Sequence, residues 1–101
     1  MVSSYEIPII DVPYQRLKTF LNGVDVALSL NWNDWLGRWS LDVEIDDETR
    51  VAGLRLVPGT DLVAGFNLGI GRLVLVDWAG RGGNPGRADL PSGTFRLISM
   101  A

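Results

Sequence analysis

The sequence predicts an all-β fold, a small antiparallel β-barrel or sandwich of six to seven short strands. Three observations lead to this prediction: apolar and polar residues alternate along several segments, turn-forming residues separate those segments, and no window shows a convincing helical period. Side chains of a strand point alternately to its two faces, so alternation predicts strands with one buried and one exposed face. An oligonucleotide-binding-like barrel is one topology that fits this pattern.

The two surest strands lie in the first half. In residues 24–32 and 39–45, aliphatic residues and one tryptophan of each segment share a single phase. Asn22-Gly23 tolerates the positive φ values of a type I′ turn and predicts a hairpin with residues 15–21. A second hairpin through residues 33–37 should bring Trp32 near Trp39. A third turn follows at residues 46–49, so residues 14–45 are expected to form a meander.

The second half is richer in glycine. Residues 50–59 read as a short strand that ends at Pro58-Gly59, whereas residues 61–71 fit either a loop with one helical turn or a broken strand. Residues 72–79 are apolar on both faces from Leu73 to Val76, which indicates a strand buried on both sides or one face given to a partner. Residues 80–93 predict a long, mobile loop, and residues 94–100 the last strand.

Composition fits one domain over residues 1–101 and limits the chemistry. The apolar fraction is 47%, the net charge is −3, and the sequence has neither cysteine nor histidine. Disulfides, thiolates and the commonest general base and metal ligand are therefore absent. The charge pattern shows no basic footprint for nucleic acid, and no stretch approaches the roughly 20 apolar residues of a membrane helix. No catalytic, cofactor or metal residue is predicted.

Three motifs that suggest ligands fit poorly. Counted from Asp42, the sixth and twelfth places of a calcium loop hold Asp47 and Gly53, where glycine and glutamate are needed. The glycines of residues 69–71 precede a strand, whereas a dinucleotide fingerprint precedes a helix. Arg81 and Arg87 in the glycine-rich loop could wrap an anion, but a loop without a ligand is the better interpretation.

The tryptophans separate into core and surface positions. Trp32 and Trp39 share the apolar phase of their strands and are expected in the core, where a buried aromatic removes roughly 150–250 Å² from water. Trp35 lies in the connection and is expected to be the most exposed, so it could stack on a sugar, anchor a partner or fold back over the hairpin. Trp78 follows the strand that is apolar on both faces, and it is expected to anchor the end of that strand.

The ordered set of short motifs along nearly the whole chain resembles the small baseplate plug domain family of contractile-tailed phages, first known from cyanophages. It begins with the segment from Tyr5 to Ile9. The residues that then carry the resemblance are Trp32, Asn33, Gly37, Arg38, Trp39, Gly53, Leu56, Val57, Pro58, Gly59, Asp61, Leu62, Leu68, Gly69, Gly71, Leu73, Val76, Asp77, Pro85, Asp89 and Leu90. Val63 departs from the leucine expected there.

The resemblance implies a non-enzymatic structural protein of the virion, made in the host cytoplasm and located in the tail baseplate. It implies binding to the baseplate hub and other tail proteins, closure of the distal end of the tail channel until infection, and a small homo-oligomeric ring, most simply a trimer. No cofactor is implied.

A docking role needs apolar strand surface beyond what one core uses. In the last strand Phe95 and Leu97 share one phase, so Ile98 and Met100 point the other way, where a neighbouring subunit is expected to cover them. The predicted protein-interface residues are Trp35, Leu73, Val74, Leu75, Val76, Trp78, Ile98 and Met100.

Three rival functions remain at this point. A small carbohydrate-binding β module would use Trp35 and Trp32 as a platform and would be monomeric. An oligonucleotide-binding barrel is disfavoured by the acidic total and by the lack of a basic, aromatic groove. An enzyme is disfavoured because no familiar nucleophile–base pair can be assembled without histidine or thiol.

Overall fold

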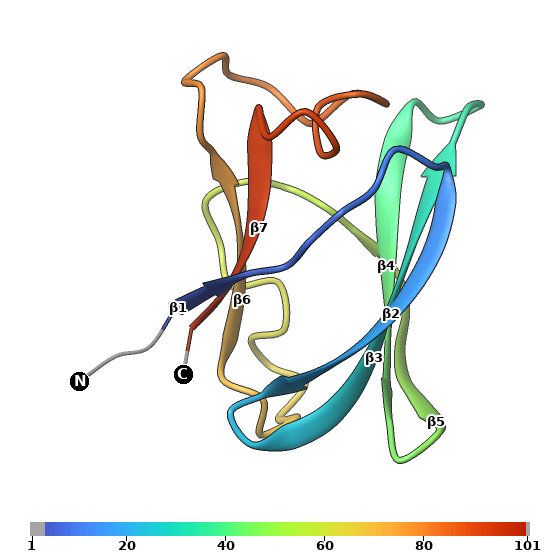
Figure 1. Ribbon diagram of the computed structural model, residues 1–101, viewed down its shortest axis with the longest axis vertical. Coiled ribbons are helices and arrows are strands. Elements are labelled where there is room, and N and C mark those ends of the chain that lie inside the picture. The colour runs from blue at the N-terminus through green and yellow to red at the C-terminus, as the bar shows by residue number, and fades with distance from the viewer. Residues whose placement is uncertain (1–3, 101) are drawn as a thin grey trace.

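Two antiparallel sheets form the fold in the computed structural model, which describes residues 4–100 (Figure 1). The first three residues and the last residue of the predicted domain lie outside the described part. The strands are β1 (Ser4–Glu6), β2 (Tyr14–Leu21), β3 (Val24–Asn33), β4 (Arg38–Ile45), β5 (Glu48–Arg55), β6 (Arg72–Asp77) and β7 (Phe95–Met100). Over residues 4–100 there is no helix, and therefore none that could cross a membrane.

The strand order confirms the all-β prediction and selects the sandwich. One sheet has the order β1-β7-β6 and the other β2-β3-β4-β5, and every pairing between strands is antiparallel. The sheets are not closed into a barrel, so the barrel alternative, including the oligonucleotide-binding-like topology, is not the one adopted. The inner faces of the two sheets meet in a single apolar core.

The predicted meander is confirmed and extends through a fourth strand, β5. Asn22 and Gly23 have φ values of 53° and 78°, the left-handed backbone that a two-residue hairpin turn requires. In the next hairpin Trp32 is the direct register partner of Trp39, and their ring centroids lie 5.7 Å apart. Trp39 is fully buried, whereas Trp32 is half-buried against the core.

A bulge bends the last pair of this sheet. The β4–β5 register shifts on both sides of Val43, and Gly53 on β5 has a φ of 67°. The Gly53 amide donates a hydrogen bond of 2.7 Å to Oδ1 of Asp42. This side chain therefore satisfies a backbone group that the regular ladder leaves free at the bulge.

The ambiguous residues 61–71 form turns. Isolated β-bridges pair Pro58 with Leu75 and Asp61 with Val74. The segment after β5 therefore runs along the edge of β6 that is not paired with β7. Oδ1 of Asp61 accepts hydrogen bonds from the amides of Val63 and Leu73 at 3.2 and 3.1 Å. Because this connection covers β6, that strand does not present an open edge to solvent.

The crossing from β1 to β2 depends on one buried polar side chain. Gln15 accepts a hydrogen bond from the Ile10 amide at 2.9 Å and donates to the carbonyls of Ile10 and Val12 at 2.8 and 3.1 Å. Both ends of its amide are thus satisfied, as a buried polar group requires. This contact fixes where the chain passes from one sheet to the other.

Residues 80–93 form the predicted long loop, and contacts along its length hold it in place. Arg81 and Arg87 pair with the carboxylates of Asp89 and Asp11 at 2.7 and 3.0 Å. Oδ1 and Oδ2 of Asp77 accept hydrogen bonds from the amides of Arg81 and Gly82 at 3.0 and 2.6 Å. Both arginines considered for anion binding are therefore already paired within the chain.

Candidate protein-docking surfaces

The outward side of the β1-β7-β6 sheet carries an apolar surface that the chain's own core does not use. Strand register places Val74 opposite Ile98 and Arg72 opposite Met100, so these side chains share one side of the sheet. Trp78, which follows β6, contacts Arg96 on that side. We call this surface the outer face and define it by Val74, Val76, Trp78, Ile98 and Met100.

Burial alternates along both strands and separates the outer face from the core. Leu73 and Leu75 on β6, and Phe95 and Leu97 on β7, are fully buried between the sheets. The residues between them are half-buried. A strand that is apolar on both sides thus gives one side to the core and leaves the other partly exposed.

Arg96 stabilises the polar margin of the outer face. Its guanidinium carbon lies 4.2 Å from the centroid of the Trp78 ring, a cation–π contact. Nε donates to the carbonyl of Gly93 at 3.2 Å, and Nη1 pairs with Oε1 of Glu6 at 3.3 Å. The outer face and its margin therefore combine tryptophan, methionine and arginine, the residue types enriched in protein interfaces.

A second apolar surface lies at the tip of the β3–β4 hairpin. Trp35 is 98% exposed, and its neighbour Leu36 is also exposed. The turn beneath them is well bonded: Asn33 accepts hydrogen bonds from the amides of Leu36 and Gly37, and Asp34 accepts one from Nε1 of Trp32. We call residues 34–36 the Trp35 tip, a bonded turn that holds an indole in solvent.

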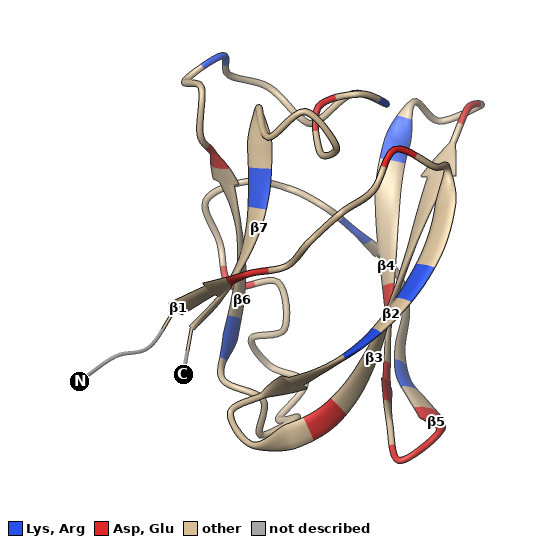
Figure 2. Cartoon of the chain, viewed as in Figure 1, with Lys and Arg blue, Asp and Glu red and all other residues tan. Residues whose placement is uncertain are grey.

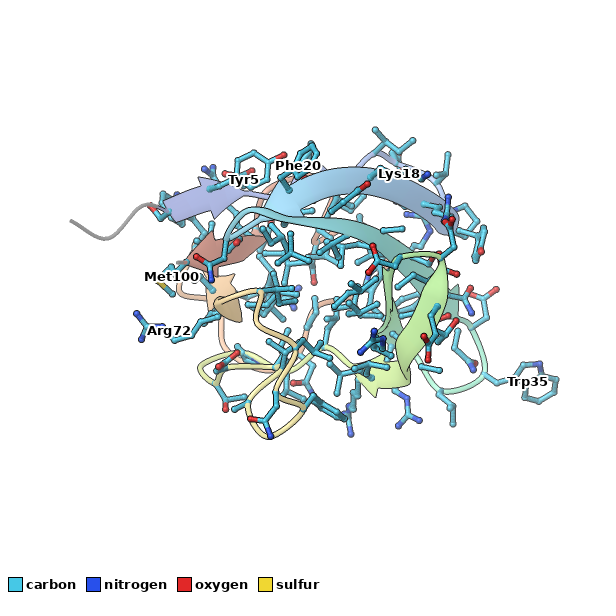
Figure 3. The ribbon with its side chains drawn as sticks, turned by 90° about the horizontal axis from the view of Figure 1, so that it is seen from below. Tyr5, Lys18, Phe20, Trp35, Arg72 and Met100 are labelled. Atoms are coloured by element: carbon cyan, nitrogen blue, oxygen red, sulfur yellow. The ribbon has the colours of Figure 1, made fainter. Side chains whose placement is uncertain are left out.

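The two surfaces lie at opposite ends of the molecule. In Figure 3 Trp35 projects at one end, whereas Arg72 and Met100 lie at the other. The structure therefore does not unite all eight predicted interface residues. Leu73 and Leu75 belong to the core, five residues form the outer face, and Trp35 stands alone. Docking at the outer face and at the Trp35 tip stays a prediction.

Two depressions mark the described surface. One, of about 250 Å³, runs between the chain after β1 and the end of the 80–93 loop, and Glu6 and Arg96 line part of it. The other, of about 140 Å³, lies on the far side of the β2-β3-β4-β5 sheet beside Lys18 and Glu44. Neither of these two depressions is lined by Trp32 or Trp35.

The acidic residues of β4 and its turn have structural partners or stand in solvent. Figure 2 shows them gathered along the β4–β5 hairpin. Glu44 pairs with Arg16 at 2.6 Å across the sheet, and this contact raises the pKa of Arg16 above its ordinary value through the hydrogen bond and the charge of Glu44. Within residues 4–100 no three acidic, histidine or cysteine side chains are grouped so as to hold a metal ion.

Among residues 4–100, sequence reasoning missed four exposed aromatics: Tyr5 on β1, Tyr14 and Phe20 on β2, and Phe66 in the connection before β6. Phe20 is 71% exposed and Tyr5 is 45% exposed, and Figure 3 shows them on the same side of the molecule. Tyr5 Oη lies 3.5 Å from Oγ1 of Thr19, which places β1 beside β2. The exposure of Phe20 could have been predicted from the alternation of β2, because Phe20 shares its phase with the charged residues Arg16 and Lys18.

Comparison with known proteins identifies one family. The model of the family described as cyanophage baseplate Pam3 plug gp18 matches residues 4–100, nearly the whole chain. No curated protein matches the sequence. The resemblance read from the short motifs is thereby confirmed.

Proposed function

The chain belongs to the cyanophage baseplate plug family, and from this premise we propose that it binds the baseplate hub and closes the distal end of the tail channel until infection. Membership makes it a structural protein of the phage tail baseplate that associates with other tail proteins. The proposal adds the hub as the partner, a homotrimeric ring as the assembly, synthesis in the host cytoplasm, and a role without catalysis.

The observation that carries the proposal is the outer face. A plug acts by binding its neighbours, so it needs apolar surface that its own core leaves uncovered. The outer face provides two valines, an isoleucine, a methionine and a tryptophan that is 58% exposed, with Arg96 stacked on the indole. An aromatic anchor beside an arginine is typical of the few residues that carry most of the binding energy in protein interfaces.

Mass measurement by light scattering, with and without the hub protein of the same baseplate, tests the proposal. We expect the chain to form a complex with the hub, and Trp78→Ala to weaken that complex at least tenfold. Phe20→Ala is the matched control, because Phe20 is also a large exposed aromatic but lies on the other sheet. A chain that ignores the hub, or equal effects of both variants, would contradict the proposal.

The carbohydrate-binding alternative makes a different prediction from the same protein. It requires the fluorescence of Trp35 to respond to soluble glycans, and it requires a monomer. The isolated position of Trp35, away from both depressions, favours a protein contact over a sugar site. A glycan response lost in Trp35→Ala, together with no hub binding, would replace the plug function with the sugar-binding one.

A further inference from the structure

We propose that the outer face binds an apolar patch of the hub that is flanked by two carboxylates about 13 Å apart, one for Arg72 and one for Arg96. We call these two residues the arginine pair. The inference rests on the proposed function, because it takes the hub as the partner. It adds the chemistry of the hub surface, which neither the fold class nor the family description supplies.

Strand register places the arginine pair on either side of an apolar centre. Arg72 lies opposite Met100, and Arg96 lies opposite Val76, so the two positions are separated by the four-residue step from Arg72 to Val76. A strand rises about 3.3 Å per residue, which puts the two arginines about 13 Å apart along the sheet. The register pair midway between them is apolar on both strands. A partner that covers the centre therefore meets a cation at each end of it (Figure 2).

The charge of this side of the sheet is opposite to that of the whole chain, which has a net charge of −3. Among residues 4–100, the charged side chains on the outward side of β1, β7 and β6 are the arginine pair and Glu6, which gives two positive charges minus one negative, or +1. Asp77 at the end of β6 has the other phase, and its carboxylate accepts amides of the 80–93 loop. Carboxylates on the partner would complement this charge.

The two arginines differ in how they are held. Arg72 is exposed and makes no ion pair among the residues that the structure describes. Arg96 stacks on Trp78 and bonds to Gly93 and Glu6, so its guanidinium is fixed before a partner arrives, while its side chain stays 33% exposed. A group that is already fixed loses less side-chain entropy on association. Arg72 therefore supplies an unpaired charge and Arg96 a preorganised one.

The number of cations favours a protein partner over an anionic membrane. Surfaces that recognise acidic lipids carry clusters of about four to eight Lys or Arg residues. The outward side of this sheet carries only the arginine pair, beside a tryptophan and a methionine. Tryptophan, methionine and arginine around an apolar centre are typical of protein interfaces.

The single lysine of the chain permits a direct test of the two contacts. Lys18 lies on β2 of the other sheet, so a side-chain amine can be introduced at one chosen position of the outward side. Arg72→Lys and Arg96→Lys keep the positive charge, and a carbodiimide joins the new amine to a carboxylate in direct contact. Mixed with the hub protein of the same baseplate, each variant should give a cross-link from position 72 or 96 to an aspartate or glutamate of the hub, located by peptide mass spectrometry.

Arg55→Lys is the matched control for this cross-linking. Arg55 is also exposed and makes no ion pair among residues 4–100, but it lies on β5 of the other sheet. It should give no cross-link to the hub. Far-UV circular dichroism with a thermal scan verifies that all three variants are folded.

Charge reversal measures what the contact contributes to affinity. Arg72→Glu should weaken hub binding about tenfold by calorimetry at low salt, because it places like charges together in the interface. The difference from wild type should shrink at about 0.5 M salt, where exposed charges are screened. Arg55→Glu is the control and should leave the affinity unchanged.

The outcomes separate this inference from the proposed function. If the hub binds wild-type protein but cross-links to only one or neither of the two positions, or binds Arg72→Glu as tightly as wild type, the carboxylate-flanked patch is overturned and the proposed function stands. If wild-type protein ignores the hub, both fall. Co-sedimentation with phosphatidylserine vesicles, without hub binding, would assign the outer face to a membrane and overturn the inference as well.

Discussion

The indole Nε1 of Trp39 donates a hydrogen bond of 2.9 Å to the carbonyl oxygen of Gly86, and so links the start of β4 to the long loop between β6 and β7. Arg87 covers the same ring, with its guanidinium carbon 5.6 Å from the ring centroid. Trp39 is fully buried and also contacts Trp32. One residue of the meander therefore positions a loop that follows it by 47 residues.

Trp39→Phe should destabilise the protein although it keeps an aromatic ring. It leaves the Gly86 carbonyl without its donor and opens space in a filled core, a loss of about 2–4 kcal/mol in the free energy of unfolding. Urea denaturation followed by circular dichroism measures it. Trp35→Phe is the matched control and should change stability by less than about 0.5 kcal/mol, because Trp35 is 98% exposed. Equal losses in both variants would contradict the role assigned to Trp39.

Gly53→Ala should destabilise the β4–β5 bulge through backbone strain. Gly53 has a φ of 67°, and a Cβ built there meets no heavy atom within 4 Å, so the cost arises from the left-handed backbone and not from a clash. We expect a loss of about 1–2 kcal/mol in the free energy of unfolding. Gly53→Asn is the control at the same position and should lose less, because asparagine tolerates this conformation better. The same urea titration compares them, and an asparagine variant weaker than the alanine one would be inconsistent with strain.

The sequence predicted what depends on local pattern. The Asn22-Gly23 turn sets the first hairpin, and the turn after Asn33 brings Trp32 beside Trp39, so neighbouring strands could be paired from the sequence. The phase of the last strand also placed Ile98 and Met100 away from the core. Each of these inferences needs only side-chain alternation and a turn within a few residues.

The remaining features depend on contacts between residues far apart in the sequence. β1 has three residues, too few for alternation to reveal a strand, and it pairs with β7 at the other end of the chain. The Arg87–Asp11 pair crosses 76 residues. On β6, a run of apolar residues does not tell which side faces the core, and only packing distinguishes Leu75 from Val76.

Glu44→Gln should have a small effect that salt removes. Glu44 pairs with Arg16 at 2.6 Å across β3, but both side chains are partly exposed, so solvent screens the pair and it contributes little to stability. We expect the difference from wild type to shrink toward zero in 1 M salt, where the screening length falls to about 3 Å. Glu48→Gln is the control, because its contact with Arg50 is 3.9 Å long and more exposed. Urea titrations at low and high salt measure both, and a salt-independent loss at Glu44 would point to packing.

Asp89→Asn should loosen residues 80–93 without unfolding the sandwich. The Asp89 carboxylate pairs with Arg81 at 2.7 Å and accepts a hydrogen bond from the Gly86 amide, and its side chain is only 15% exposed. Hydrogen bonds to charged groups contribute about 1.5–3 kcal/mol, so removing the charge should raise the population of the open loop about tenfold.

Limited trypsin digestion measures this opening. The rate of cleavage after Arg81 and Arg87 is proportional to the population of the open loop when the loop recloses quickly. We expect cleavage at these two positions to be about tenfold faster in Asp89→Asn, with the thermal midpoint little changed. Asp11→Asn is the matched control: it also removes a partner of an arginine in this loop, but Asp11 is 79% exposed and the pair is therefore weak. If Asp11→Asn accelerated cleavage as much as Asp89→Asn, the partly buried Asp89 carboxylate would not be the group that holds the loop.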